Sequence, residues 1–190
     1  MTRSHAFQPH AFRSHAFGRM SIALHWLVAA GIIGMLAFGM VIGAMESGRE
    51  KTEAIQIHKS IGLVVGVLAL ARLVWRVREG FPQPLPGLPR WERLAARRAH
   101  ELLLVLTVLM PVTGILKSVT YARPIQVFGM PFIPQLLDEK NVPLNEVVSS
   151  THMLAGYLLA ALVLLHVAAA LKHHVIDRDG TLSRILKPAG

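Results

Sequence analysis

The sequence predicts an all-α membrane protein, a bundle of four transmembrane helices, and three observations support this. The chain of 190 residues is 53% hydrophobic and only 16% charged, whereas soluble domains are usually about 25% charged. Four apolar segments are each close to the ~20 residues that a helix needs to cross a bilayer. The cationic side chains cluster beside these segments, which is typical of membrane proteins. We therefore expect contact with membrane lipid and none with nucleic acid.

The four predicted spans cover residues 20–44, 57–77, 99–119 and 148–171. Between residues 23 and 42 of the first span, His25 is the one ionisable side chain. The third span contains Pro111 and Gly114, both of which membrane helices tolerate. Buried helices of a soluble bundle are an alternative for the second and third spans only. We expect a flexible arm over residues 1–19 with a His-Ala-Phe repeat, a four-helix domain over 20–175 and a tail over 176–190.

The distribution of Lys and Arg predicts the orientation of these spans. Fourteen of the twenty cationic residues precede the first span, follow the fourth, or lie at or between the ends of the second and third. The positive-inside rule therefore places both termini in the cytoplasm, and basic residues clustered beside apolar runs are typical of an inner-membrane protein. The loop over residues 120–147 is then on the outer side, where we expect it to cap the outer face.

The spans contain four histidines, and an ionisable residue inside a span indicates a functional site. His25 and His166 each lie about five residues from the inner end of their span, whereas His58 and His152 lie near the outer ends. Fourteen residues separate His152 from His166, so they share one helix face about 21 Å apart, at ~1.5 Å per residue. The fourth helix can thus supply a ligand to each of two stacked sites.

Two opposed imidazoles inside a bundle fit haem iron better than zinc. The chain has no cysteine, which excludes thiolate-held clusters and covalent haem attachment. Zinc normally takes a third or fourth protein ligand, whereas haem iron takes two axial ligands because the porphyrin supplies the rest. The sequence therefore predicts two non-covalent haems b. Small residues four and eight positions beyond the outer histidines either make room for a macrocycle or serve helix packing: Gly62, Gly66, Gly156 and Ala160.

Four further residues are candidates for contacts to a haem propionate or a quinone. Arg72 lies fourteen residues beyond His58, on the same helix face at the inner level; snorkelling to lipid headgroups is the alternative for Arg72 and for Arg76. His100 follows two arginines at the inner boundary and is either an interfacial residue or such a contact. His173 lies at the inner end of the fourth helix, where the helix dipole also suits an imidazole.

Four segments, in this order and spacing, resemble the bacterial cytochrome b561 family over roughly residues 19–187. They are Ile22-Ala23-Leu24-His25-Trp26-Leu27, Ile57-His58-Lys59-Ser60-Ile61-Gly62, Ala99-His100 through Pro111-Val112-Thr113-Gly114, and His152 with Leu165-His166-Val167-Ala168. The resemblance implies a four-helix di-haem protein in which His25 and His166 hold the inner haem and His58 and His152 the outer one. It also implies superoxide oxidation at the outer face with reduction of ubiquinone.

Three functions follow from these observations. In the first, the chain is a superoxide:ubiquinone oxidoreductase, and Lys59, Lys117 and Arg123 either attract an anion to the outer rim or are ordinary boundary residues. In the second, the chain is a non-enzymatic subunit that passes electrons between quinone and a partner redox protein. In the third, it is a small-solute transporter whose histidines relay protons, without haem. No catalytic residue is assigned.

Overall fold

The computed structural model describes residues 17–80 and 89–187, so most of the predicted N-terminal arm lies outside the described residues. Four long helices make up most of the chain: α1 (Arg19–Ala44), α2 (Arg49–Glu79), α3 (Arg90–Thr120) and α4 (Val142–Lys172). All four are long and apolar enough to cross a membrane, which confirms the predicted all-α class and four-helix organisation. Each helix contains one predicted span and extends beyond it.

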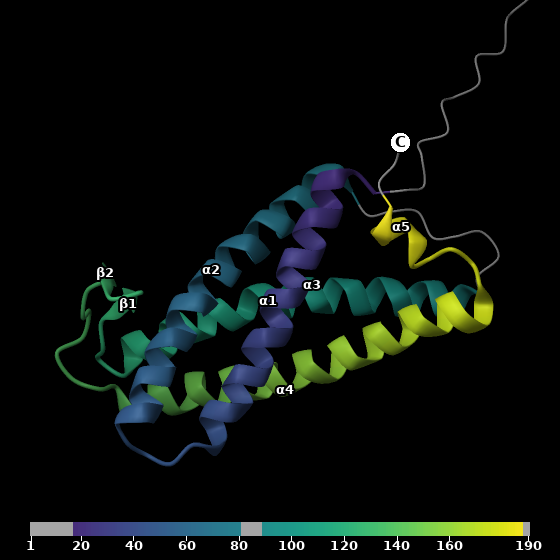
Figure 1. Cartoon of the computed structure of the whole chain (residues 1–190). Helices are drawn as coiled ribbons and strands as arrows, with labels where there is room; N and C mark the ends of the chain where they lie inside the picture. Colours follow the sequence, from purple (N-terminus) through teal and green to yellow (C-terminus); the bar gives the residue numbers. More distant parts are fainter. Residues whose placement is uncertain (1–16, 81–88, 188–190) are drawn as a thin grey trace, which may run out of the picture.

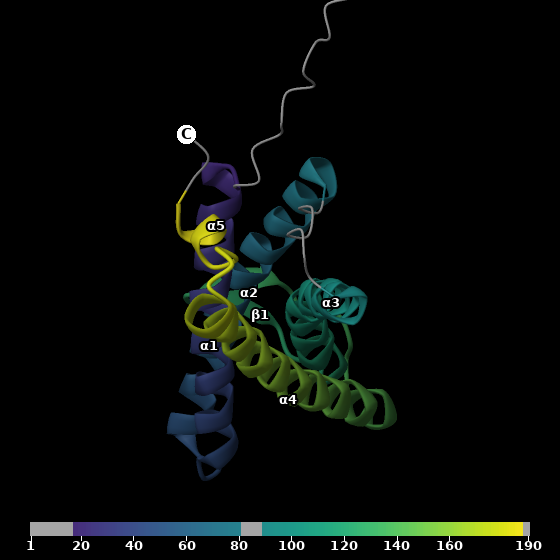
Figure 2. The same ribbon diagram turned by 90° about the vertical axis from the view of Figure 1, so that its right-hand side faces the viewer.

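The helices form two antiparallel pairs that cross each other. Helices α1 and α2 form one pair, and α3 and α4 form the other (Figure 1). The view turned by 90° shows the α3–α4 pair inclined to α1 (Figure 2). One end of the bundle, here called the tail end, contains the start of α1 and the end of α4. The opposite end, here called the hairpin end, contains the β-hairpin between α3 and α4.

Close backbone approaches between α1, α2 and α3 hold the centre of the bundle. A Cβ on Gly66 of α2 would come within 2.7 Å of the Pro111 side chain on α3, and one on Gly31 would come within 2.8 Å of Val65. Both positions therefore require glycine because the helices pack there without room for a side chain. The surrounding apolar core consists of Val28, Ile32, Val65, Ala69, Leu106, Ala155 and Leu159.

Most apolar side chains of the long helices face outward. Leu164 on α4 is 72% exposed and Val67 on α2 is 64% exposed, and in the most apolar stretch of α4 only 11% of residues are buried. A soluble protein rarely exposes contiguous apolar surface on this scale. The exposed surface of the helices is therefore the surface that lipid covers in a multi-pass membrane protein.

The segment predicted as the outer loop, residues 120–147, is more ordered than a loop. It contains the antiparallel strands β1 (Ile125–Val127) and β2 (Met130–Ile133), and α4 already begins at Val142. The strands are joined by Phe128 and Gly129, both with positive φ, which suits a two-residue hairpin turn. Buried Ser60 on α2 accepts a hydrogen bond from the Phe128 N–H at 3.0 Å, so the hairpin is attached to the bundle.

The tail end is closed by the C-terminal segment. After α4, the chain forms one π-helical turn, η1 (His173–Asp177), and a short helix, α5 (Ser183–Leu186). The indole N–H of Trp26 donates a hydrogen bond to the carbonyl oxygen of Ile185 at 3.1 Å. This bond connects α5 to α1, and Figure 1 shows α5 beside the first turns of α1.

Candidate functional site

The structure brings His25 of α1 and His166 of α4 together toward the tail end. Their ring centroids are 6.3 Å apart, with the ring planes at 58°. Two imidazoles on opposite sides of one metal ion, with metal–nitrogen bonds of about 2 Å, have centroids about 6 Å apart once the ring radius is added on each side. The spacing therefore fits two axial ligands of one iron.

A guanidinium lies beside this pair. Arg72 Nη2 lies 3.0 Å from Nδ1 of His25, so a positively charged group faces one nitrogen of this imidazole. The charge of Arg72 also acts on His166. His100 of α3 packs edge-on against His166, with centroids 5.2 Å apart. Two sequence candidates, Arg72 and His100, are thus at the tail-end pair.

His58 of α2 and His152 of α4 occupy the corresponding place toward the hairpin end. The two side chains are close enough to interact electrostatically, and Phe38 of α1 lies against His58 with ring centroids 5.7 Å apart. Nδ1 of His58 is buried and has no hydrogen-bond partner among the described residues. A Cβ on Gly39 would come within 3.4 Å of the His58 ring, so backbone approaches this imidazole closely.

The second imidazole of this pair is held by a hydroxyl. Oγ1 of Thr113 lies 2.8 Å from Nδ1 of His152, and a Cβ on Gly114 would lie 3.5 Å from Cε1 of the same ring. Thr113 is buried, with an exposed fraction of 4%. The sequence motif contains Thr113 and Gly114 but assigns neither a role. Their contact with His152 depends on how α3 packs against α4, which the sequence alone does not show.

Cations surround the hairpin-end pair. The charge of Lys117 acts on both His58 and His152, and Lys59 interacts with both Arg123 and Lys117. Arg123 and Lys140 both lie over the ring of Tyr121, at 4.6 and 4.7 Å from its centroid. The structure thus gathers the three predicted rim cations at one end of the bundle, together with Lys140.

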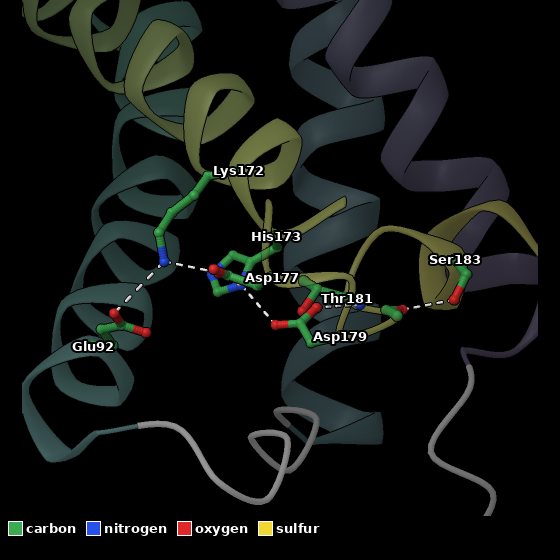
Figure 3. A network of polar contacts seen from close by, with 8 residues as sticks. Glu92, Lys172, His173, Asp177, Asp179, Thr181 and Ser183 are labelled. Atoms are coloured by element: carbon green, nitrogen blue, oxygen red, sulfur yellow. Dashed lines mark hydrogen bonds and ion pairs between the residues drawn. The ribbon is translucent and has the colours of Figure 1, made fainter. Parts of the chain in front are cut away.

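Two other sequence candidates have different surroundings. Arg76 is 12% exposed as a side chain and lies 3.8 Å from Glu79, and its guanidinium donates to the carbonyl oxygen of Gly80 at 3.1 Å. His173 belongs to the polar network in Figure 3, where its Nδ1 lies 2.7 Å from Asp179 and 3.0 Å from Asp177. The charge of Arg76 acts on His25, whereas His173 is in no described contact with a histidine pair.

The network around His173 is held by charge. Lys172 Nζ lies 2.7 Å from Asp177 and 3.7 Å from Glu92 (Figure 3), and Asp179 accepts a hydrogen bond from the Thr181 N–H at 2.9 Å. Partial burial raises the pKa of Asp179, but the hydrogen bonds from Thr181 and His173 outweigh it and hold that pKa below its usual value. The carboxylates are therefore already paired, and the network joins the end of α4 to the tail.

The donor sets distinguish haem from zinc at the two histidine pairs. Over residues 17–80 and 89–187, the one group of three side chains placed to share a metal ion is His173, Asp177 and Asp179. Neither histidine pair has such a third ligand, as a zinc site normally requires. Two imidazoles alone suffice for haem iron. Among the small residues, Gly66 packs against the side chain of Pro111, which favours the helix-packing explanation at that position.

Comparison with known proteins agrees with this assignment. The sequence profile of the prokaryotic cytochrome b561 family matches residues 16–188. "Cytochrome b561 homolog 2" of Escherichia coli K12 is 36% identical over 171 residues, which cover 89% of this chain and 90% of that protein. "Cytochrome b561 homolog 1" of the same organism is 30% identical over 134 residues, covering 69% and 73%.

A third relative has an activity in its name. "Probable superoxide oxidase CybB" of Yersinia pestis is 25% identical over 171 residues, which cover 88% of this chain and 93% of that protein. The family profile and the first relative each cover most of the chain. The chain is therefore a member of the prokaryotic cytochrome b561 family, membrane proteins that transfer electrons by means of b-type haem.

Proposed function

We propose that the chain binds two haems b and oxidises superoxide at the hairpin end while reducing ubiquinone. The observation that carries this proposal is the pairing of the span histidines into one pair toward each end of a lipid-exposed bundle. His25 and His166 would hold the haem at the tail end, and His58 and His152 would hold the one at the hairpin end. When bound, each haem would supply reversible one-electron transfer.

The cations at the hairpin end give this end a role in anion capture. Lys117 acts electrostatically on both histidines of the pair there, and Lys59 and Arg123 extend the positive field around it. A field of this kind raises the local concentration of an anion and its rate of association. Superoxide is a small anion, and the relative named as a superoxide oxidase supports this choice of substrate.

The electron and proton balance of this reaction requires two superoxide anions for each ubiquinone. Two superoxide anions each lose one electron and leave as dioxygen, and one ubiquinone gains two electrons and two protons to become ubiquinol. We assign ubiquinone to the tail end, where His100 on the exposed surface of α3 also contacts the ring of His166. His173 is already bonded to two carboxylates, so His100 is the better placed of the two candidates. In this proposal Arg72, which lies beside His25, pairs with a haem propionate.

The positive-inside rule orients this reaction in the inner membrane of a bacterium. The tail end contains the start of α1, the end of α2, the start of α3 and the end of α4, where most of the Lys and Arg residues gather. The tail end and both termini are therefore cytoplasmic in this proposal. The hairpin end then faces the compartment outside the cytoplasm, where superoxide would be collected.

The test is superoxide-driven reduction of ubiquinone by the purified haem-loaded protein. We expect ubiquinol to form at one per two superoxide anions consumed, faster than in the protein-free control. Charge reversal in Lys117→Glu should slow the reaction about tenfold and weaken its dependence on ionic strength, because the variant removes attraction at the rim. Arg78→Glu makes the same charge change at the tail end and should leave the rate unchanged.

Two results would contradict the proposal in different ways. If the purified chain contains haem but forms no ubiquinol from superoxide, the superoxide assignment is wrong, and a subunit that exchanges electrons with a partner redox protein becomes the better explanation. In that case a partner should co-purify with the chain. If the folded chain binds no haem, both electron-transfer functions are wrong.

A further inference from the structure

We propose that Thr113 is a positioning residue that fixes the protonation of the His152 imidazole and lowers the reduction potential at the hairpin-end pair. This inference rests on the proposed haem ligation by His58 and His152. Its starting point is the 2.8 Å contact between Oγ1 of Thr113 and Nδ1 of His152, which joins α3 to α4. The backbone carbonyl of Met110 also bonds to this imidazole.

The surroundings of the hydroxyl determine the direction of this hydrogen bond. Thr113 Oγ1 lies 2.9 Å from the carbonyl oxygen of Leu109 and 3.0 Å from that of Met110. Carbonyl oxygens only accept hydrogen bonds, so the single hydroxyl proton is directed to them. The lone pairs of Oγ1 then face His152, and Nδ1 donates its proton to the threonine.

This direction prepares His152 to bind a metal through its other nitrogen. A neutral imidazole that carries its proton on Nδ1 has its free lone pair on Nε2. Ligand histidines usually donate their second N–H to a fixed acceptor, which orients the ring and raises its basicity. A more basic imidazole stabilises the oxidised metal, so the hydroxyl favours ferric over ferrous iron at this pair.

The structure limits the effect to one imidazole of the pair. Nδ1 of His58 is buried without a hydrogen-bond partner among the described residues, so the hydroxyl acts on His152 alone. At the tail end, Nδ1 of His25 faces the guanidinium of Arg72, which accepts no hydrogen bond. Removal of the Thr113 hydroxyl should therefore change one haem and leave the other as it is.

The test is a potentiometric titration of the haem-loaded Thr113→Val variant, with haem content measured in the same preparation. Valine keeps the shape of threonine and removes the hydroxyl. A hydrogen bond of ordinary strength that differs between the two oxidation states changes the equilibrium about three- to tenfold. We expect reduction of one haem to become about three- to tenfold more favourable, or ~30–60 mV at 59 mV per tenfold for one electron, and its ferric EPR signal to shift.

Two further variants separate this role from a structural one. Thr113→Ser retains the hydroxyl and should restore the wild-type potential. Thr107→Val removes a buried hydroxyl of the same helix that bonds to the carbonyl oxygen of Leu104 at 2.9 Å. This hydroxyl has no histidine among its hydrogen-bond partners in the described residues, so the variant should leave both potentials unchanged. Unchanged potentials in Thr113→Val, with both haems present, would overturn the inference while leaving the haem ligation intact.

Loss of haem from the valine variant would also give an answer. The affinity for haem would then be measured by titrating haem into the haem-free protein. Loss of a residue that orients a metal ligand typically lowers the affinity 10–100-fold. Wild-type affinity in Thr113→Ser supports the positioning role, and a serine variant as weak as the valine variant overturns it. If His152→Ala retains the wild-type haem content, the proposed ligand set itself is wrong, which is a separate failure.

Discussion

At the tail end a guanidinium faces an imidazole nitrogen, whereas at the hairpin end a hydroxyl does. Arg72 lies 3.0 Å from Nδ1 of His25, and Thr113 lies 2.8 Å from Nδ1 of His152. Both partners come from a helix other than that of the histidine they contact. The first can only donate a hydrogen bond and carries a positive charge, and the second can accept one and is neutral.

This difference shows how two sites with the same pair of histidine ligands can shift the reduction potential of a bound haem in opposite directions. A positive charge beside a haem disfavours its oxidised form, because oxidation adds positive charge to the iron. A hydrogen-bond acceptor on a ligand imidazole favours the oxidised form instead. In the proposed di-haem protein the two ends would therefore shift the potentials of their haems in opposite directions.

Replacing one histidine of each pair should remove one haem from the corresponding end. We expect haem content, measured by the pyridine haemochrome assay, to fall from two per chain to about one in His152→Ala and in His166→Ala. In a potentiometric titration the two variants should lose different redox components, because the two histidines belong to different pairs. His174→Ala, at an exposed position next to the paired His173, serves as the control and should retain two. Loss of both haems from each variant would show that the ends are not independent.

Removing the charge of Arg72 should lower the potential of the tail-end haem alone. With an effective dielectric constant of ~20, a charge a few ångströms away contributes a few kcal/mol at most, so we expect a decrease on the order of 50 mV in Arg72→Gln. Arg72→Lys keeps the charge, so its reduction potential should be close to that of the wild-type protein. Redox titration is the measurement, and a positive shift would contradict the contrast between the ends.

The hairpin end also differs from the tail end in how its cover is attached, and Ser60 is the residue that tests this attachment. Its buried hydroxyl accepts from the Phe128 N–H at 3.0 Å and donates to the Gln56 carbonyl at 2.9 Å. Ser60→Ala removes the acceptor, at a cost of about 1 kcal/mol, so the Phe128 amide should exchange about fivefold faster with deuterium. Ser118→Ala removes a buried serine hydroxyl that bonds only to its own helix in the described contacts, and it should leave Phe128 unchanged.

The apolar runs of the sequence predict the four helices, and the distance of each histidine from its span end predicts which histidines share a level. Apolar runs fix the spans, and the fourteen residues between His152 and His166 fix the shared helix face. The partners of the histidines depend on which helices pack together. Thr113 was therefore missed, and Arg72 was placed at the correct level without its contact to His25. Gly66 had two explanations in sequence, and only the approach of Pro111 distinguishes them.

The smallest expected effect compares the two turns that flank α4. Beyond its tail end, the Asp179 carboxylate accepts the Thr181 N–H at 2.9 Å, whereas at its start the neutral Asn141 side chain accepts the Leu144 N–H at 3.2 Å. Because the pKa of Asp179 is lowered in the folded chain, its charged form stabilises the turn above the ordinary carboxyl pKa, and this contribution is lost as the pH falls through the lowered value. The Thr181 amide should therefore lose protection from hydrogen exchange in acid, after correction for the intrinsic rate, while Leu144 keeps its own. Equal loss at both amides would mean that acid loosens α4 as a whole, and that the charge of Asp179 has no separate role in holding the tail.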